Sequence, residues 1–544
     1  MKKVLIIGSG ISGLSAAIHC AAKGIEVTLV SPYSPERAQS VMASGGINAV
    51  LSQGEAGDSI ESHIEDTLEV GCFLAGKEAV KGLCENAPDI IRWLERLGTV
   101  FSVDSDDNIR RRAFGGQSHN RTCYAGTSTG KQIVTALVME VRRYEMAGLI
   151  TRRNGLDFYK ALIRDGICYG AVLYNEIEDD FELIQADFVI VASGGQNALF
   201  GKTTGSILND GYVAGKLFMQ GVELKNLEFI QYHPTTIDTT NKHMLVSEAV
   251  RGEGGRLYYT DNGNRVYFME DKYGAKGNLM PRDVVSRCIE ETGRDVYLDI
   301  TFLGKKEILR RIPEVYDLCM KYKGVDISKE SIKVEPSVHF FMGGIAVNNK
   351  HETSVHNLYA IGECASIYHG ANRLGGNSLL AAVYSGKVAG ESIRSASVKE
   401  HNIDFSDELN NAKKEIEAIN SAKGTHTISH IRDELANVMK DDLGIIRNGK
   451  ALQRGIDKIS EYQSCVDRLD ISNNDRVYDG YSLKAILALA KATLVCAESR
   501  KESRGAHYRS DYADTDDKCK ASTIISYNRG KYSTYLDLEK EFEK

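Results

Sequence analysis

A histidine, an arginine and two glycine-rich stretches lie close together between residues 339 and 378. His339 is followed by the pair Gly343 and Gly344, and Arg373 precedes a second glycine-rich segment that ends at Ser378. Imidazole and guanidinium groups bind carboxylates, and glycine lets the backbone approach a flat ring closely. This combination predicts a site that holds a small anion against a flat cofactor.

The N-terminus predicts what that cofactor is. An apolar, strand-like run from Lys2 to Ile7 leads into GSGISG at residues 8–13, and a helical pattern follows from Leu14 to Ala22. In such a unit the three glycines permit a tight turn, close approach to a pyrophosphate, and close packing of helix on strand. The next strand, Glu26 to Val30, ends at Ser31 and not at the acidic residue that grips an NAD ribose, which favours FAD.

The elements that must position these residues belong to a large chain, whose 544 residues predict roughly two to four domains. The formal net charge of -7 gives no electrostatic case for a nucleic-acid partner. The eleven cysteines are scattered without a CxxC pair, which predicts reduced thiols, a cytoplasmic location and no metal or iron–sulfur site in this chain. No apolar run approaches the ~20 residues of a membrane helix and the N-terminus begins with a strand, so we expect no direct membrane insertion.

The character of the sequence changes several times along the chain. A second apolar strand, Phe188 to Val191, ends in a glycine-rich turn, which predicts another backbone loop beside the cofactor. Residues 231–334 are mixed in pattern and rich in charge and tyrosine, which predicts a substrate-covering insertion. Residues 403–504 show long amphipathic helical patterns, for example from Ser482 to Ala497. The charged segment from Asp511 to Lys544 is expected to lie over the surface as a tail.

Several motifs occur in the order of one flavoprotein family. They are GSGISG at 8–13, SGGINA at 44–49, QYHPT at 231–235, SEAVRGEGG at 247–255, PRDVVSR at 281–287, the segments around His339 and Arg373, and ESRGAHYR at 502–509. From residue 2 to about residue 511 the chain resembles the fumarate reductase, succinate dehydrogenase and L-aspartate oxidase flavoproteins. The resemblance implies an α/β fold: a Rossmann-like FAD-binding domain at 1–230 and 335–400, an inserted α+β capping domain at 231–334, a C-terminal helical domain at 401–510 and a tail at 511–544.

The resemblance also implies hydride transfer between flavin N5 and a four-carbon dicarboxylate, coupled to proton transfer at the neighbouring carbon. Arg282 matches the family's catalytic proton donor, and Glu248 and Arg251 match its proton relay. A guanidinium is normally not deprotonated at neutral pH, so a relay must return its proton quickly. The residues expected to bind the substrate carboxylates are His233, Ser247, His339 and Arg373.

The residues expected to contact FAD come from separate stretches of the chain. They are Gly8, Gly10, Ile11, Ser12, Gly13, Ser31, Gln39, Ser40, Ser44, Gly45, Gly46, Ala192, Ser193, Gly194, Asp210, Glu363, Asn377, Ser378 and Leu379. Taken alone, a histidine such as His233 is more often a hydrogen-bonded structural residue, and an adjacent pair such as Arg282 and Asp283 is usually solvated. Their joint occurrence in the family's order favours the functional interpretation.

Two positions separate this chain from individual members of the family. Respiratory fumarate reductases and succinate dehydrogenases attach FAD through a histidine, where this chain has Gln39. A carboxamide cannot form that bond, so we expect noncovalent FAD, as in L-aspartate oxidase. That oxidase carries a glutamate where this chain has Phe114, which cannot neutralise the substrate's ammonium group. The sequence SEAVR at 247–251 and the chain length, however, are nearer the oxidase.

We therefore expect an FAD-dependent oxidoreductase that interconverts fumarate and succinate. The alternative is L-aspartate oxidase, which makes iminoaspartate for NAD biosynthesis. A flavin-binding sensor or assembly subunit without turnover is the alternative from another class, and such a protein has no need for a proton relay. The electron partner is left open between an iron–sulfur subunit and a soluble electron donor.

Overall fold

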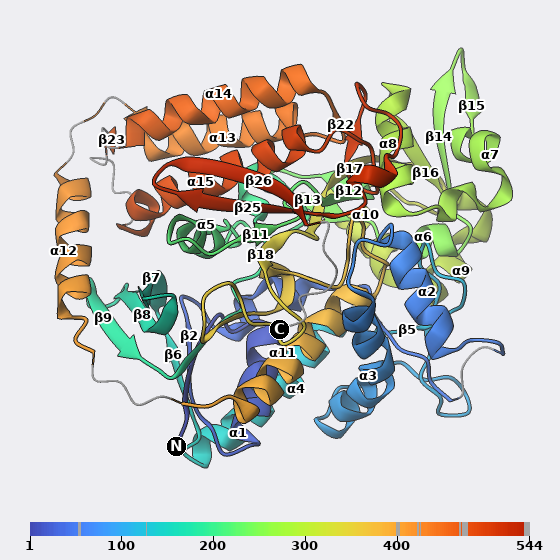
Figure 1. Cartoon of the computed structure of the whole chain (residues 1–544). Coiled ribbons are helices and arrows are strands. Elements are labelled where there is room, and N and C mark those ends of the chain that lie inside the picture. The colour runs from blue at the N-terminus through green and yellow to red at the C-terminus, as the bar shows by residue number, and fades with distance from the viewer. Residues whose placement is uncertain are drawn as a thin grey trace.

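The structure, a computed structural model, describes residues 1–52, 56–126, 128–398, 403–421, 424, 426–466, 469–470 and 477–537. At its centre is a five-stranded parallel sheet in the order β19-β10-β1-β2-β6 (Figure 1). The strands are β1 (Lys3–Ile7), β2 (Glu26–Ser31), β6 (Ile150–Asn154), β10 (Phe188–Val191) and β19 (Leu358–Ala360). In β1 every residue from Val4 to Ile7 is buried, because a central parallel strand has both faces covered.

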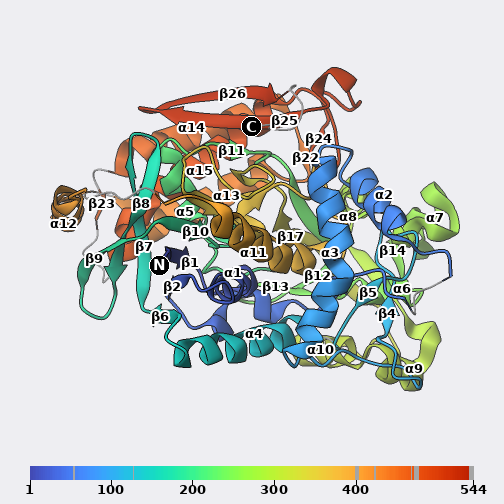
Figure 2. The same cartoon turned by 60° about the horizontal axis from the view of Figure 1, so that its bottom comes forward.

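Helices cover this sheet. α1 (Ile11–Ala21) packs on β1 and β2, while α4 (Thr129–Met146) and α11 (Asn377–Ser395) pack on α1, as Figure 2 shows. α3 (Lys77–Arg96) lies between α11 and α2 (Ile60–Val70). The sheet, α1, α3, α4 and α11 share one hydrophobic core, whereas α2 packs on α3 through a small separate cluster.

The turn between β1 and α1 explains two glycines of the first motif. Gly8 has a φ of +111°, and a Cβ there would lie 2.3 Å from the carbonyl oxygen of Ala192. A Cβ at Gly13 would lie 1.9 Å from the carbonyl oxygen of Gly8. Both distances are shorter than any side chain tolerates, so only glycine lets β1, α1 and the end of β10 approach each other this closely.

Smaller sheets extend the nucleotide-binding part of the chain. β7 (Leu156–Arg164), β8 (Ile167–Asn175) and β9 (Asp180–Gln185) form an antiparallel sheet beside β2 and α5 (Tyr212–Met219). β3 (Ile47–Asn48), β5 (Thr122–Cys123) and β4 (Arg111–Arg112) form another. The second of these sheets fixes the loop that contains Phe114, since β4 and β5 are the strands on either side of it.

The inserted region has a six-stranded sheet and a hydrophobic core of its own, and lies at the right of Figure 1. The strand order is β13 (His243–Leu245), β12 (Ile230–Asp238), β17 (Ile332–Phe341), β16 (Val296–Asp299), β14 (Arg256–Asp261) and β15 (Asn264–Val266). Its helices are α6 (Ala249–Gly252), α7 (Phe268–Tyr273), α8 (Arg282–Thr292), α9 (Gly304–Arg311) and α10 (Pro313–Lys323). The paired strands β12 and β17 run across the domain boundaries expected at 230/231 and 334/335, so the backbone is continuous sheet there.

The helical region contains α12 (Ser406–Asn420), α13 (Ile428–Asp442), α14 (Gly449–Cys465) and α15 (Val477–Ser499). The prediction of an amphipathic helix at 482–497 is wrong, because all of these residues except Lys484, Lys491 and Val495 are buried. α15 contacts α5, α12, α13, α14 and β26 (Lys531–Asp537), so little of its surface is left for solvent.

α15 also bears on the expectation that no run is apolar enough for a membrane. Within the described parts of the chain, α15 is the one helix that is long and apolar enough to cross a membrane, with 23 residues and a mean hydropathy of 1.4. In the fold, however, 83% of that window is buried inside the protein, as in the core helix of a globular protein.

The C-terminal segment differs from the expected surface tail. β25 (Ser522–Asn528) and β26 join β11 (Leu224–Lys225), β18 (Gly344–Ala346) and β20 (Ala365–Ser366) in a five-stranded sheet. Thr523, Ile524 and Ile525 in β25 are buried. Two-residue strand pairs, β21 (His426–Thr427) with β23 (Leu469–Asp470) and β22 (Ile446–Arg447) with β24 (Tyr508–Arg509), complete the region. The expected boundary at 400/401 and the end of the tail, 538–544, lie outside the described residues.

Candidate active site

One large cavity, about 540 Å³ in volume, lies between the central sheet and the inserted region. Its walls include residues directly after the carboxyl ends of β1, β2, β10 and β19, the edge at which ligands of open α/β sheets bind. Of the expected FAD contacts, all except Ile11, Gly13 and Asn377 line this cavity. Of the expected catalytic and substrate residues, all except Arg251 line it.

The three exceptions among the FAD contacts have structural surroundings. The backbone N–H of Ile11 donates to Oγ of Ser40 at 3.3 Å, and Gly13 packs on Gly8. The side chain of Asn377 accepts from Asn48 at 2.8 Å and donates to Thr67 at 2.9 Å. Asn377 therefore holds the first turn of α11 in place and does not face the cavity, so a contact between its side chain and FAD is not supported.

The glycine-rich end of the cavity fits the pyrophosphate of a dinucleotide. α1 begins at Ile11 after Gly10, its first turn has no acidic residue, and among its first N–H groups that of Ile11 bonds to the hydroxyl of Ser40. The N–H groups of such a turn and the positive end of the helix dipole attract an anion. A Cβ at Gly10 would lie 3.3 Å from Oγ of Ser40, so a side chain there would narrow the approach.

At the other end of the cavity, three charged side chains form a continuous chain of hydrogen bonds. Arg282 donates from Nε and Nη2 to Oε2 of Glu248 at 2.9 and 2.8 Å. Arg251 donates to Oε1 of Glu248 at 3.1 Å and to the carbonyl oxygen of Asn278 at 2.5 Å. Arg282 is only 7% exposed, so its guanidinium is not a solvated surface charge. The backbone N–H of Gly115 also donates to Oε1 of Glu248, at 3.1 Å.

Gln231 links this chain to the second arginine of the cavity. Its Oε1 accepts from Nη1 of Arg282 at 3.0 Å and from Nη2 of Arg373 at 2.9 Å. Its Nε2 donates to Asn372 at 2.8 Å. Sequence reasoning missed Gln231, although it lies two residues before His233 in β12 and alternate residues of a strand share a face.

Two histidines from adjacent strands meet beside the arginines. The rings of His233, in β12, and His339, in β17, lie 5.3 Å apart between centroids, with an angle of 67° between their planes. Nδ1 of His233 lies 3.1 Å from the carbonyl oxygen of Thr235, and its Nε2 is buried without a hydrogen-bond partner among the described residues. Nδ1 of His339 lies 2.9 Å from the hydroxyl of Thr204, a cavity residue that the sequence did not indicate.

The charges of the cavity set the ionisation of these groups. Burial opposes ionisation of Glu248, but the charges of Arg282 and Arg251 outweigh it and lower its pKa to about 2. Burial and then the charge of Arg282 lower the pKa of His339 and of His233 well below the usual range, so both rings are neutral near pH 7. The same two causes lower the pKa of Arg373. An anion placed between the two arginines would relieve the repulsion between them.

The residues at which the family members differ also line this cavity. Gln39, in a 3₁₀ turn, accepts a hydrogen bond from the backbone N–H of Ser206. The ring of Phe114 packs against Gly375 and Gly45, where added Cβ atoms would lie 3.1 and 3.4 Å from it. Asp210 accepts from the hydroxyl of Tyr478 at 2.8 Å. Tyr478 comes from α15, and no local motif marks it as a cavity residue.

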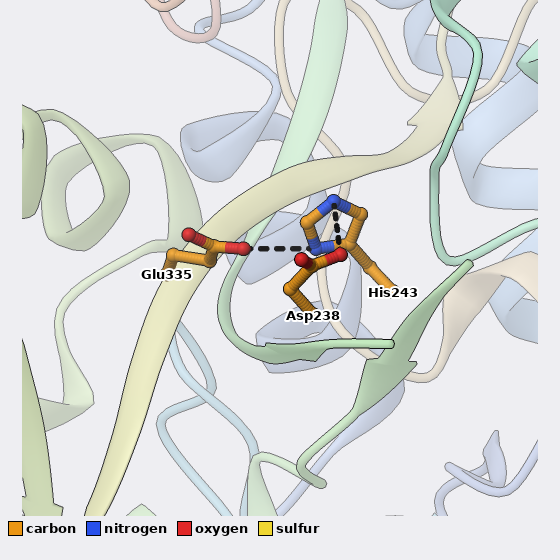
Figure 3. Close-up of side chains that lie close together, drawn as sticks. All are labelled: Asp238, His243 and Glu335. Atoms are coloured by element: carbon orange, nitrogen blue, oxygen red, sulfur yellow. Dashed lines mark ion pairs between the residues drawn. The ribbon is translucent and has the colours of Figure 1, made fainter. Parts of the chain in front are cut away.

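A histidine and two carboxylates gather on neighbouring strands of the inserted sheet (Figure 3). Glu335 lies 3.3 Å from Nδ1 of His243, whereas Asp238 lies 3.8 Å from Nε2, on the other side of the ring. Lys202 also pairs with Asp238, at 2.5 Å. One ligand atom from each of the three residues lies within 4.8 Å of the others, but the ammonium group of Lys202 already pairs with Asp238, so a cation there would compete with Lys202.

Comparison with known proteins agrees with these features. Residues 3–379 match the family model described as an FAD binding domain, and residues 432–541 match fumarate reductase flavoprotein C-term. The chain is 38% identical over 539 residues to the succinate dehydrogenase flavoprotein subunit of Bacillus subtilis, covering 95% of this chain and 92% of that protein. It is 34% identical over 548 residues to the fumarate reductase flavoprotein subunit of Haemophilus influenzae, covering 94% and 90%.

A solved structure of a quinol-fumarate reductase with menaquinol molecules matches with a TM-score of 0.92 and 31% identity, covering 100% of both chains. The fold is thus that of the whole relative, with FAD-binding, capping and C-terminal helical domains. The chain therefore belongs to the FAD-dependent fumarate reductase and succinate dehydrogenase flavoprotein family.

Proposed function

We propose that this protein interconverts fumarate and succinate, using noncovalent FAD. The observation that carries the proposal is the group of Arg282, Arg373, His233 and His339 in one cavity with the glycine-rich dinucleotide end. Relatives named for succinate and for fumarate chemistry cover nearly the whole chain, which supports the same substrate class.

The cavity has the charges that a dicarboxylate needs. Arg373 presents a planar guanidinium that can bind a carboxylate with two parallel hydrogen bonds. The neutral rings of His233 and His339, and the hydroxyl of Ser247, line the same cavity as further donors. Because these groups come from different strands and loops, they can hold the two ends of a four-carbon acid separately.

FAD, when bound, would supply the redox chemistry: its reduced form would give a hydride to one central carbon of fumarate, and its oxidised form would accept one from succinate. Arg282 then gives a proton to the neighbouring carbon in the reducing direction. Glu248 is ionised and bonded to both arginines, so it can return a proton to Arg282 from Arg251. The relay moves a proton along bonds of 2.8 to 3.1 Å without leaving a buried charge unpaired.

The alternative, L-aspartate oxidation, requires a group that neutralises an ammonium. Phe114 offers an apolar ring, and the guanidinium of Arg112 lies 5.7 Å from the ring centroid. An ammonium placed there would meet a positive charge and no carboxylate from this loop, which favours the uncharged centre of fumarate.

The deciding experiment supplies purified protein with fumarate and reduced methyl viologen, and separately with L-aspartate and oxygen. We expect fumarate-dependent oxidation of the dye and no hydrogen peroxide from aspartate. Formation of oxaloacetate and peroxide in the second assay, with no dye oxidation in the first, would reverse the assignment.

The covalency of FAD has its own test. Gln39 stands in the cavity and its carboxamide oxygen already accepts from Ser206, so it offers no nucleophile for a flavin bond. Acid precipitation of the holoprotein should release all of the yellow cofactor into the supernatant. Flavin that stays with the pellet would show a covalent bond and contradict the role given to Gln39.

We infer further that electrons reach the site through another protein. The relatives are named as flavoprotein subunits, and the cysteines in the described parts of the chain are free, without a cluster-binding arrangement. An iron–sulfur subunit is the partner we expect, with a soluble donor as the alternative. Purification from the native cell should yield a complex with iron–sulfur absorbance, whereas a colourless partner or none would favour the soluble donor.

A further inference from the structure

His339 lines the cavity, and each of its ring nitrogens has a different environment. Nδ1 lies 2.9 Å from the hydroxyl oxygen of Thr204, while Nε2 has no hydrogen-bond partner among the described residues. The ring is neutral near pH 7 and so carries one proton. Which nitrogen holds that proton decides whether His339 offers a donor or a lone pair to a ligand.

The hydroxyl of Thr204 has one proton and two acceptors within reach. Oγ1 lies 3.1 Å from the carbonyl oxygen of Val338, besides the contact to Nδ1 of His339. The same carbonyl already accepts the backbone N–H of Thr204, at 3.1 Å. Since Val338 keeps a hydrogen bond either way, the hydroxyl can donate to Nδ1 without leaving a buried carbonyl unpaired.

His233 shows a similar arrangement built from backbone groups. The N–H of Thr235 lies 3.3 Å from Nδ1 of His233, and the carbonyl oxygen of Thr235 lies 3.1 Å from the same nitrogen. No side-chain substitution can remove either group. The contact to His339 is different, because one hydroxyl makes it, and a single substitution removes it.

We propose that Thr204 is a positioning residue that fixes the substrate-binding tautomer of His339. Its hydroxyl donates to Nδ1, which leaves the ring proton on Nε2 as a donor to a substrate carboxylate. In the opposite tautomer a nitrogen lone pair would face the anion and repel it. This inference rests on the proposed dicarboxylate site and adds the residue that sets its hydrogen-bond polarity.

The test compares three variants of the FAD-loaded protein. Thr204→Val removes the hydroxyl and keeps the shape, whereas Thr204→Ser keeps the hydroxyl and removes a methyl group. Thr203→Val is the matched control, because the hydroxyl of Thr203 bonds only the N–H of Gly205, at 3.1 Å, and does not line the cavity. Binding of malonate, a dicarboxylate that cannot be reduced, is followed through the flavin absorbance, beside kcat and KM for fumarate.

We expect Thr204→Val to raise the malonate Kd and the KM for fumarate about 10- to 100-fold, the loss of one hydrogen bond to a charged ligand, with FAD content unchanged. Thr204→Ser and Thr203→Val should stay within about threefold of the wild type. Equal malonate affinity in Thr204→Val and wild type, or an equal loss in Thr204→Ser and Thr204→Val, would overturn the role of Thr204. Failure of the wild type to bind malonate would instead overturn the proposed function, and this inference with it.

Discussion

Arg282 is held in place by side chains of the protein itself. Nε and Nη2 bond to Glu248 and Nη1 bonds to Gln231, so each of the three guanidinium nitrogens has a fixed partner. A guanidinium held in this way loses little freedom when it meets a substrate carbon, which favours proton transfer from a defined position.

Replacing Arg282 by alanine is expected to lower fumarate-dependent dye oxidation by about 10²- to 10⁴-fold, the usual contribution of a positioned acid. The flavin spectrum should not change, because the contacts expected for FAD lie elsewhere in the cavity. Arg287→Ala is the matched control: Arg287 lies in the same helix, stacks on Tyr508 at 4.6 Å and does not line the cavity. Full activity in Arg282→Ala would remove it from its assigned role.

Glu363 gives the cavity a measurable pH dependence, because burial raises its pKa from 4.5 to about 7. The folded protein therefore holds this proton more tightly than the unfolded chain. The contribution of Glu363 to the free energy of unfolding is therefore fully present below its ordinary pKa of 4.5 and is lost as the pH rises through about 7. In thermal scans of FAD-free protein, the unfolding temperature should fall between about pH 5 and pH 8 more steeply in the wild type than in Glu363→Gln. Parallel slopes would contradict this.

The residues that could be predicted are those whose chemistry leaves few substitutes. Few residue types can bind a carboxylate with two hydrogen bonds, and only glycine leaves room for a backbone carbonyl close to its Cα. Arg373 and Gly8 could therefore be predicted from sequence motifs. Gln231 and Thr204 hold other side chains, and several residue types could do that work. Asn377 is the converse case, because the side chain of this polar residue in a cofactor motif bonds Asn48 and Thr67 and so serves the packing of α11.

At the scale of elements, the loop between β4 and β5 links the wall of the cavity to the proposed proton relay. Phe114 lines the cavity, and the next residue, Gly115, donates its N–H to Glu248. The side chain of Gln117 holds the loop in place, because its Nε2 donates to Oδ1 of Asn48 at 3.0 Å and to the carbonyl oxygen of Gly375 at 2.9 Å. This loop contains Phe114, the position at which L-aspartate oxidases carry a glutamate. The same loop therefore also positions the carboxylate of Glu248, which lies between Arg282 and Arg251.

Gly115→Ala tests this coupling. A Cβ at Gly115 would lie 2.7 Å from Oε1 of Glu248 and 3.0 Å from the carbonyl oxygen of Met280, so Glu248 must move. We expect a fall in kcat of about tenfold or more with FAD retained, since small displacements of a proton-transfer group are costly. The control is Gly76→Ala, whose Cβ would have 3.9 Å to its nearest neighbour. An unchanged kcat in Gly115→Ala would show that Glu248 need not be held there.

Two elements were misread from the sequence for one physical reason. The periodicity of apolar residues predicts which face of a helix is exposed to solvent. Almost no face of α15 is exposed, because helices and a strand surround it. Charges and tyrosines in the last residues predicted a solvated tail, yet alternate exposure along β26 is what the outer strand of a sheet shows. Local patterns cannot reveal which distant segments will cover an element.

At the scale of the whole molecule, the C-terminal strand β25 reaches the backbone that leads into the active site. Thr523 donates from its hydroxyl to Glu228 at 2.6 Å and accepts from Arg500 at 2.8 Å. Arg500 also pairs with Glu228 at 2.6 Å, and neither side chain is exposed. Glu228 lies two residues before β12, the strand that carries Gln231 and His233. Thr523 of β25 thus bonds both members of a buried ion pair that lies next to the start of β12.

Shortening the chain tests whether these bonds support the site. A protein that ends at Ala521 loses β25 and β26 and opens the pair of Glu228 and Arg500 to water on one side. Because the truncation removes the hydroxyl that bonds both charges and the buried side chains of Ile524 and Ile525, we expect the unfolding temperature to drop by more than about 5 °C, with loss of fumarate reduction. The control ends at Asp537 and keeps both strands, so it should unfold and turn over like the full chain. If both shortened proteins behave alike, the ion pair is stable without β25, and the hairpin does not hold the active-site strand.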